Sequence, residues 1–134
     1  MLSKKAQYAL KAAGYLAARY ESGPVQISEI SEQKRIPLKF LENILLELNR
    51  AGILESKKGK GGGYRIREAP ENITLAKIIR TIDGPISMMP CVSLYFYEKC
   101  GDCDEAQCQI NRVFAEARDA TLQVLENRTL RDIM

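Results

Sequence analysis

Residues 57–63 read Lys-Lys-Gly-Lys-Gly-Gly-Gly, with three lysines and four glycines in seven positions. Glycine is the residue with the most backbone freedom, so this segment favours a flexible connection over a continued helix or strand. Stretches typical of short β-strands lie on both sides, at residues 53–56 and 64–67. The sequence therefore predicts a two-stranded hairpin with a flexible, positively charged tip.

Three helices are predicted before this hairpin. Apolar residues recur at helical spacing from residue 4 to about residue 20, and the turn residues at 21–24 end that helix. Ser28 is expected to cap a short second helix. Pro37 suits the first turn of a third helix, because its missing N–H would be unpaired there. The third helix runs to about residue 49 and directs five apolar residues at the core: Phe40, Leu41, Ile44, Leu45 and Leu48.

Two further helices are predicted after the hairpin. Thr74 caps the first, which ends at the Asp-Gly-Pro of residues 83–85. An irregular segment with all the cysteines follows, and then a long final helix. The apolar stripe of that helix has no remaining core of its own to cover, so we expect a partner chain to cover it. The stripe consists of Ile110, Val113, Phe114, Ala117, Ala120, Thr121 and Val124.

Charge and composition restrict the function. The 134 residues carry a net charge of +3, but residues 1–68 hold 13 of the 20 basic residues and only 7 of the 17 acidic ones, which favours a polyanionic partner for that half. Histidine is absent, which excludes a Ser–His or Cys–His hydrolase, and we expect no enzyme. No apolar run reaches the roughly 20 residues that span a bilayer, so we expect a cytoplasmic protein without a membrane partner.

Helices followed by a basic hairpin form the layout of a winged helix-turn-helix. Asn43 suits a bidentate contact to adenine, Glu42 a cytosine amino group, and Lys39 a phosphate or guanine. A third helix that is merely solvated, or a hairpin tip without function, remains open, whereas a phosphate-binding loop is excluded because no Ser or Thr opens a helix after the glycines. The residues expected at DNA are Ser28, Pro37, Lys39, Phe40, Glu42, Asn43, Lys57, Lys58, Gly59, Lys60 and Gly61.

The four cysteines lie close together in the sequence. Cys91, Cys100, Cys103 and Cys108 have the spacing Cys-x8-Cys-x2-Cys-x4-Cys. Such a cluster in a reducing compartment is more often a metal site or redox device than a set of disulfides. Thiolates select iron–sulfur clusters or zinc, and the spacing does not decide between them. A thiol switch and ordinary free cysteines are the other interpretations.

A series of short motifs carries a family resemblance. In order these are Tyr-Ala-Leu at 8–10, Ile-Ser-Glu-Ile-Ser at 27–31, Ile-Pro at 36–37, Phe-Leu-Glu at 40–42, Ala-Gly-Ile-Leu at 51–54, Gly-Gly-Gly-Tyr at 61–64 and Ile-Asp-Gly at 82–84. With the cysteine cluster, they make the whole chain resemble the IscR/NsrR/CymR group of bacterial regulators, the Rrf-two family. The resemblance implies a dimeric winged-helix transcription factor whose long helix pairs the subunits.

Some members of that group hold an iron–sulfur cluster with three cysteines. This chain has four, with Asn111 where some relatives have His and Gln7 where others have a carboxylate. The resemblance implies a [2Fe-2S] or [4Fe-4S] cluster, with zinc or no metal as the alternatives.

The expected fold is mainly α, a winged helix-turn-helix with a two-stranded wing and a long C-terminal dimerisation helix. Residues 1–83 are expected to form the DNA-binding domain, and residues 84–134 the sensor loop and dimerisation helix. The expected function is sequence-specific DNA binding to a palindromic operator by a homodimer, under control of an iron–sulfur cluster or thiol redox state. The alternative is a cysteine-cluster redox or metal-handling protein that binds nucleic acid non-specifically.

Overall fold

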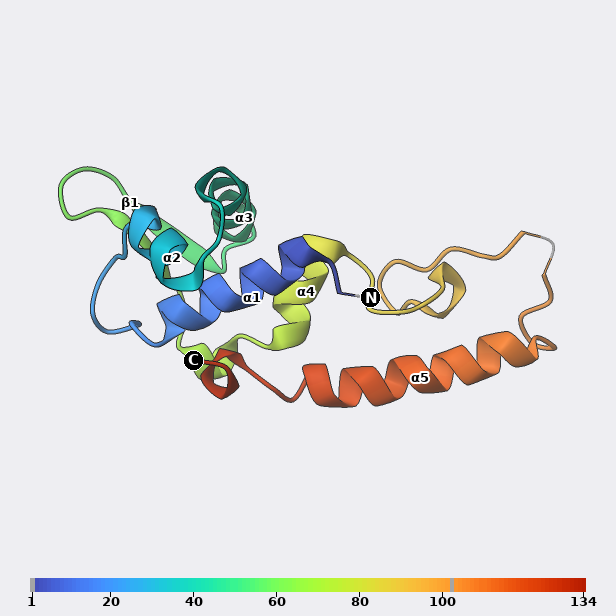
Figure 1. The fold of residues 1–134 in the computed structure, drawn as a ribbon. Coiled ribbons are helices and arrows are strands. Elements are labelled where there is room, and N and C mark those ends of the chain that lie inside the picture. Colours follow the sequence, from blue (N-terminus) through green and yellow to red (C-terminus); the bar gives the residue numbers. More distant parts are fainter. Residues whose placement is uncertain (1, 102) are drawn as a thin grey trace.

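A computed structural model describes residues 2–101 and 103–134. Its elements confirm the mainly helical winged-helix fold (Figure 1). Within the described residues, no helix has the length and apolar character needed to cross a membrane. The helices are α1 (Lys4–Ala17), α2 (Ile27–Lys34), α3 (Leu38–Arg50), α4 (Leu75–Asp83) and α5 (Gln109–Leu125); the strands are β1 (Leu54–Lys57) and β2 (Gly63–Ile66); the short 3₁₀ turns are η1 (Pro70–Asn72), η2 (Pro90–Val92) and η3 (Leu130–Asp132).

Residues 2–83, together with Leu130 near the C-terminus, pack around one apolar core, and this part of the molecule is called the head here. Helix α1 contributes a face of small residues that lets α3 and α4 approach closely. Helix α3 buries one stripe and exposes the other side, as its periodicity predicts. Fully buried residues of the core include Ala9, Ala13, Leu16, Ile30, Leu41, Ile44, Leu45, Leu48, Ile53, Leu54, Ile66, Ile73 and Ile78.

The wing is an antiparallel pair that a third segment extends. Leu54 pairs with Ile66 and Lys57 with Gly63. Val25 and Tyr64 exchange two backbone hydrogen bonds of 2.8 Å, so the segment before α2 is anchored to β2. Gly63 has φ +143°, and a Cβ there would lie 2.2 Å from the Val25 carbonyl oxygen, so this close approach requires glycine.

The structure corrects two predicted helix starts. Helix α2 begins at Ile27 with Gln26 as its N-cap, so Ser28 lies inside the first turn and does not cap the helix. The reason is the anchoring of Val25 on β2, which makes the chain turn into the helix directly after Gln26. Pro37 is the N-cap of α3, with ψ 128°, and the first helical residue is Leu38. By contrast, Thr74 caps α4 as predicted, since its hydroxyl accepts from the Lys77 amide at 3.1 Å.

The C-terminus returns to the head after α5. Leu130 in η3 is fully buried in the core, and its amide donates to the Ile73 carbonyl at 3.0 Å. Thr129 forms a β-bridge with Thr74 at the start of α4. Helix α5 thus spans from the cysteine segment, residues 84–108, back to the head (Figure 1). The wing and the cysteine segment lie at opposite ends of the molecule.

Candidate nucleic-acid interface and cysteine segment

The exposed side of α3 carries the residues predicted to read bases. The Lys39 side chain is 94% exposed, and its amino group lies 3.7 Å from the Glu42 carboxylate. Asn43 is exposed one position further along the helix. Three polar side chains of different hydrogen-bonding type therefore lie free for contact near the N-terminal half of α3, the end that enters the major groove in helix-turn-helix proteins.

Phe40 points another way. Its ring is half buried and meets the Tyr8 ring edge-on, with the centroids 5.6 Å apart. Phe40 therefore packs α3 against α1, which orients the exposed side of α3.

The tip of the wing is exposed from Lys57 to Gly61. Gly59 and Gly61 have φ +91° and +76°, left-handed values that glycine adopts without a steric penalty. Gly62 is buried, and a Cβ there would lie 2.2 Å from the Lys57 carbonyl oxygen. The glycines thus fold the tip tightly and leave the amino groups of Lys57, Lys58 and Lys60 at the surface. In Figure 1 the tip and α3 lie on the same, upper side of the head, with α2 between them in this view.

Two basic residues near this surface were not among the predicted site residues. Lys34 ends α2, and Arg35 follows it in the left-handed conformation with φ 54°. Both are exposed in the turn between α2 and α3. Their adjacent positive charges just before Ile-Pro were the available signal in the sequence. Ser28 is exposed in the first turn of α2.

Helix α2 is fixed to α1 by a buried phenol. The Tyr15 hydroxyl donates to the Glu29 carboxylate at 2.5 Å, and the Arg19 guanidinium stacks 3.6 Å from the Tyr15 ring centroid. Burial and the hydrogen bond to Glu29 raise the pKa of Tyr15 above its usual range, so the phenol stays neutral and keeps this contact.

The cysteines are distributed over the segment between α4 and α5. Cys91 lies in η2 and Cys108 is the N-cap of α5, where its Sγ accepts from the Asn111 amide at 3.4 Å. Burial, and then the neighbouring charges of the Cys100 and Cys108 thiolates, raise the pKa of the Cys103 thiol. Cys103 therefore lies beside Cys100 and beside Cys108. Cys100 is exposed, and the other three are half buried.

Tyr97 lies in the same segment and is hydrogen-bonded within it. Its hydroxyl donates to the Glu105 carboxylate at 2.6 Å, and this bond is the largest cause of the raised pKa of Tyr97. The charges of the Cys91 and Cys103 thiolates raise the same pKa by smaller amounts. Across residues 2–101 and 103–134, no set of three or more Cys, Asp or Glu side chains is arranged to enclose a metal ion.

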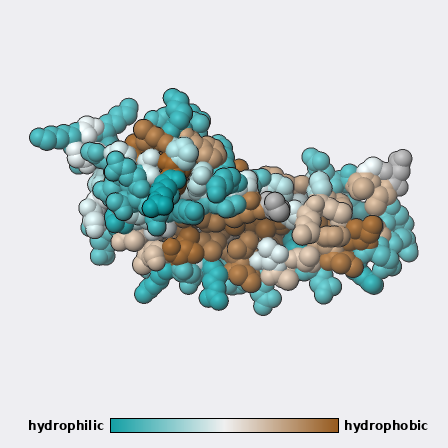
Figure 2. All heavy atoms as spheres, in the orientation of Figure 1, coloured by the Kyte–Doolittle hydropathy of each residue, from teal (hydrophilic) through white to brown (hydrophobic). Residues whose placement is uncertain are grey.

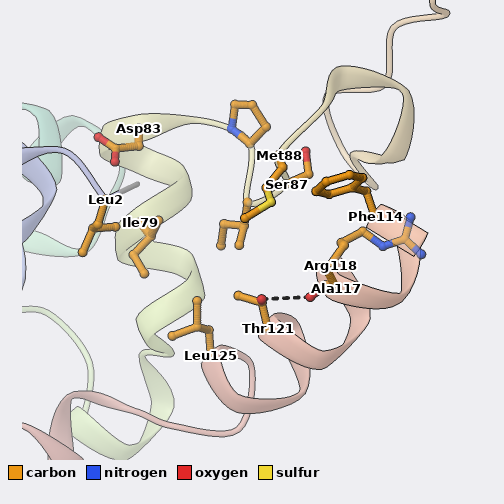
Figure 3. Close-up of a pocket in the computed structure, with 12 residues that line it drawn as sticks. Leu2, Ile79, Asp83, Ser87, Met88, Phe114, Ala117, Arg118, Thr121 and Leu125 are labelled. Atoms are coloured by element: carbon orange, nitrogen blue, oxygen red, sulfur yellow. Dashed lines mark hydrogen bonds between the residues drawn. The ribbon is translucent and has the colours of Figure 1, made fainter. Parts of the chain in front are cut away.

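An apolar pocket of about 360 Å³ separates α4 from α5 (Figure 3). Ile79, Phe114 and Leu125 line it, together with residues 85–88 of the cysteine segment. Phe114 is half buried here, so part of the predicted stripe lies against its own chain. Ile110, Val113 and Val124 are 60%, 54% and 55% exposed on the outer side of α5. Figure 2 shows apolar residues between the head and α5, in contrast to the polar wing tip.

Comparison with known proteins agrees with this architecture. The Rrf2 family, described as an iron-dependent transcriptional regulator, matches residues 2–134. An rrf2-like HTH-type transcriptional regulator of Rhodobacter capsulatus is 42% identical, over 100% of this chain and 92% of its own length.

Two solved structures have the same fold over nearly the whole chain. CymR, the global cysteine regulator of B. subtilis, superposes with a TM-score of 0.81 at 30% identity, over 98% of this chain and 94% of CymR. The IscR of T. potens has a TM-score of 0.79 at 26% identity, over 98% and 84% of the two chains. The family, the sequence relatives and the structural neighbours are all regulators of transcription and not enzymes. The chain therefore belongs to the Rrf2 family of DNA-binding transcriptional regulators.

Proposed function

We propose that two copies of this chain bind a palindromic operator through α3 and the wing. The observation that carries the proposal is that α3, whose outer side is exposed, and the lysine-rich tip lie on the same side of the head, the side away from α5 (Figure 1). In this arrangement α3 enters the major groove, where Asn43 pairs with adenine and Glu42 accepts from a cytosine amino group. Lys39 contacts phosphate or guanine. Ser28 and Pro37 are exposed at the starts of α2 and α3, on the expected path of the phosphates.

The wing supplies the part of the affinity that does not depend on sequence. The amino groups of Lys57, Lys58 and Lys60 neutralise phosphates or enter a narrow minor groove, while Gly59 and Gly61 let the backbone come close. Since its ligand is genomic DNA, we place the protein in the cytoplasm.

The outer side of α5 forms the dimer interface in this proposal. Ile110, Val113 and Val124 expose apolar surface that a two-fold related α5 would cover. The pocket beside Phe114 adds apolar surface next to it. A two-fold dimer places the two α3 helices on successive major grooves, about 34–36 Å apart.

The cysteine segment is the proposed sensor, so residues 1–83 form the DNA-binding unit and residues 84–134 the regulatory one. The type of donor fits an iron–sulfur cluster, because four thiols lie on one segment and Cys103 lies beside Cys100 and Cys108. Cys91, Cys103 and Cys108 are the principal ligands, and Cys100 is the candidate for a fourth. Cys91 in η2 and Cys108 at the start of α5 would hold such a cluster between them, and it would supply a redox-active, charged group there. Loss of the cluster would free residues 86–107 and change how the two heads are held.

A mobility shift tests the DNA-binding proposal. Specific binding to a palindromic promoter fragment, resistant to competitor duplex, is the expected result. Equal binding to every duplex would instead support the alternative of a redox or metal-handling protein with incidental affinity for nucleic acid.

Protein purified without air tests the sensor. We expect visible absorption, and iron and sulfide in stoichiometric amounts, which Cys→Ser variants of Cys91, Cys103 and Cys108 lose. The Cys100→Ser variant should lose least. Stoichiometric zinc without iron would assign a zinc site, and a metal-free protein whose DNA affinity responds to oxidant would assign a thiol switch.

A further inference from the structure

We propose that Arg118 is a positioning residue for Cys91. From the middle of α5, its Nη1 donates to the Val92 carbonyl oxygen at 2.7 Å. Val92 follows Cys91 in the 3₁₀ turn η2, so this bond holds the turn that carries the cysteine. The functional consequence rests on the proposed role of Cys91 as a metal ligand, whereas the contact itself is a property of the protein without metal.

Burial makes this contact strong. The Arg118 side chain is 16% exposed, and Val92 is 2% exposed where η2 packs on α5. A carbonyl in such a place needs a donor, because losing its partner costs the desolvation of the group. The guanidinium supplies a charge-assisted bond, which is stronger than a neutral one.

Asp119 fixes the direction of the guanidinium. Its Oδ1 accepts from both Nε and Nη2 of Arg118, at 2.9 and 2.7 Å. These two bonds hold the planar group so that Nη1 remains for Val92. Figure 3 shows Arg118 on α5 next to Phe114, at the border of the apolar pocket.

A second arginine holds the same segment a few residues later. The Arg80 guanidinium of α4 lies 4.4 Å from the Tyr95 ring centroid, and its Nη2 lies 2.6 Å from a carboxylate oxygen of Glu126 at the end of α5. Cys91 lies before both contacts and is held by them, whereas Cys100 and Cys103 lie beyond both. Of the three cysteines that precede α5 by more than one residue, Cys91 is therefore the one whose position depends on packing against α4 and α5, and a force on Cys91 is transmitted to α5.

Thiol labelling of the metal-free 134-residue chain tests directly whether the bond from Arg118 to the Val92 carbonyl holds Cys91 in place. In a background with Cys100, Cys103 and Cys108 replaced by Ser, Cys91 is the only thiol, and its rate of reaction with a maleimide reports how often η2 leaves α5. Arg118→Met keeps the length of the side chain and removes its donors. We expect the rate to rise by about tenfold, as the loss of one charge-assisted hydrogen bond implies. The rate for Arg118→Lys should lie between the rates of the parent background and of Arg118→Met.

Matched variants separate positioning from general loosening. Arg112→Met makes the same change at an exposed arginine of the same helix and should leave the rate unchanged. In a second background with Cys100 as the only thiol, Arg118→Met should also leave the rate unchanged. An unchanged rate at Cys91, or equal increases at Cys91 and Cys100, would overturn the proposal. Circular dichroism confirms that each variant is folded, and if Arg118→Met is not, Arg118→Lys decides by the same criterion.

Binding of cobalt(II) tests whether the contact of Arg118 with Val92 matters for the proposed metal site. Thiolate coordination gives Co²⁺ an intense charge-transfer absorption, and Arg118→Met in the four-cysteine chain should weaken Co²⁺ binding by about tenfold if Cys91 is a ligand. A parent chain that binds no Co²⁺, iron or zinc would contradict the proposed sensor, yet the labelling rates would still decide the role of Arg118.

Discussion

Asn43 presents an exposed amide on the side of α3 that faces away from the core. Since an amide reads adenine through two hydrogen bonds, Asn43→Ala should relax the preference at one base pair of each half-site, by about 1–3 kcal/mol. Affinity for unrelated duplexes should stay unchanged. Fluorescence anisotropy with a set of operator variants measures this, with Gln123→Ala on the exposed side of α5 as the control. Uniform weakening on all sequences would contradict a reading role.

Glycine is needed in the wing for two different reasons, a left-handed backbone at Gly61 and a close approach to Val25 at Gly63. Gly61→Ala meets no neighbouring atom and should cost only the left-handed conformation, about 1–2 kcal/mol. Gly63→Ala should cost more, because its Cβ would overlap the Val25 carbonyl and force β2 away from the segment before α2. Urea denaturation of the two variants gives the comparison. Equal losses would show that the Val25–Tyr64 pairing contributes little to stability.

The wing acts as an element through its summed charge. Replacing Lys57, Lys58 and Lys60 by Gln should weaken binding to every duplex and lower the slope of log affinity against log salt by up to about 2.7, about 0.9 for each lysine. A salt titration on specific and random DNA measures both effects. The charge-matched control replaces Lys77, Lys99 and Arg112, which are exposed outside the wing and α3. If the control lowered the slope as much, net charge and not the wing would be responsible.

Helix α5 has two apolar sides with different surroundings. Leu122 is 8% exposed and Phe114 half buried on the inner side, whereas Val113 remains 54% exposed on the outer side. A plain count of apolar positions at helical spacing merges these sides into one stripe. The inner and outer sides can be distinguished only when the path of α5 past α4 is known. A substitution at Val113 therefore tests dimer formation without disturbing the packing inside one chain, whereas a substitution at Phe114 would affect both.

At the scale of the whole molecule, Val113→Glu should produce a folded monomer. An interfacial carboxylate without a partner is costly to bury, while the same residue in a single chain faces water. Light scattering should show a dimer for the parent chain and half that mass for the variant, which should also lose its preference for a palindrome over a single half-site. Gln123→Glu, with a similar exposed position on α5, should remain dimeric. A monomeric parent chain at micromolar concentration would refute the proposed assembly.

The elements of this protein follow from local patterns in the sequence. The glycine–lysine run forces a turn, and the flanking strands lie within one residue of their predicted positions. The apolar stripes of α1 and α3 face the core as predicted. Thr74 caps its helix because capping involves atoms only three residues apart. Such features depend only on residues that are neighbours along the chain, so the sequence alone is enough to predict them.

Contacts between distant residues required the tertiary structure. Val25 pairs with Tyr64, and α2 therefore begins at Ile27, so Ser28 is not the N-cap that the sequence predicts. Leu130 completes a core that lies mostly more than fifty residues earlier in the chain, and nothing local to residues 128–133 indicates it. The bond from Arg118 to the Val92 carbonyl spans 26 residues. Sequence periodicity shows which side of an element is apolar, but only packing determines what that side meets, because burial is a property of the assembled chain.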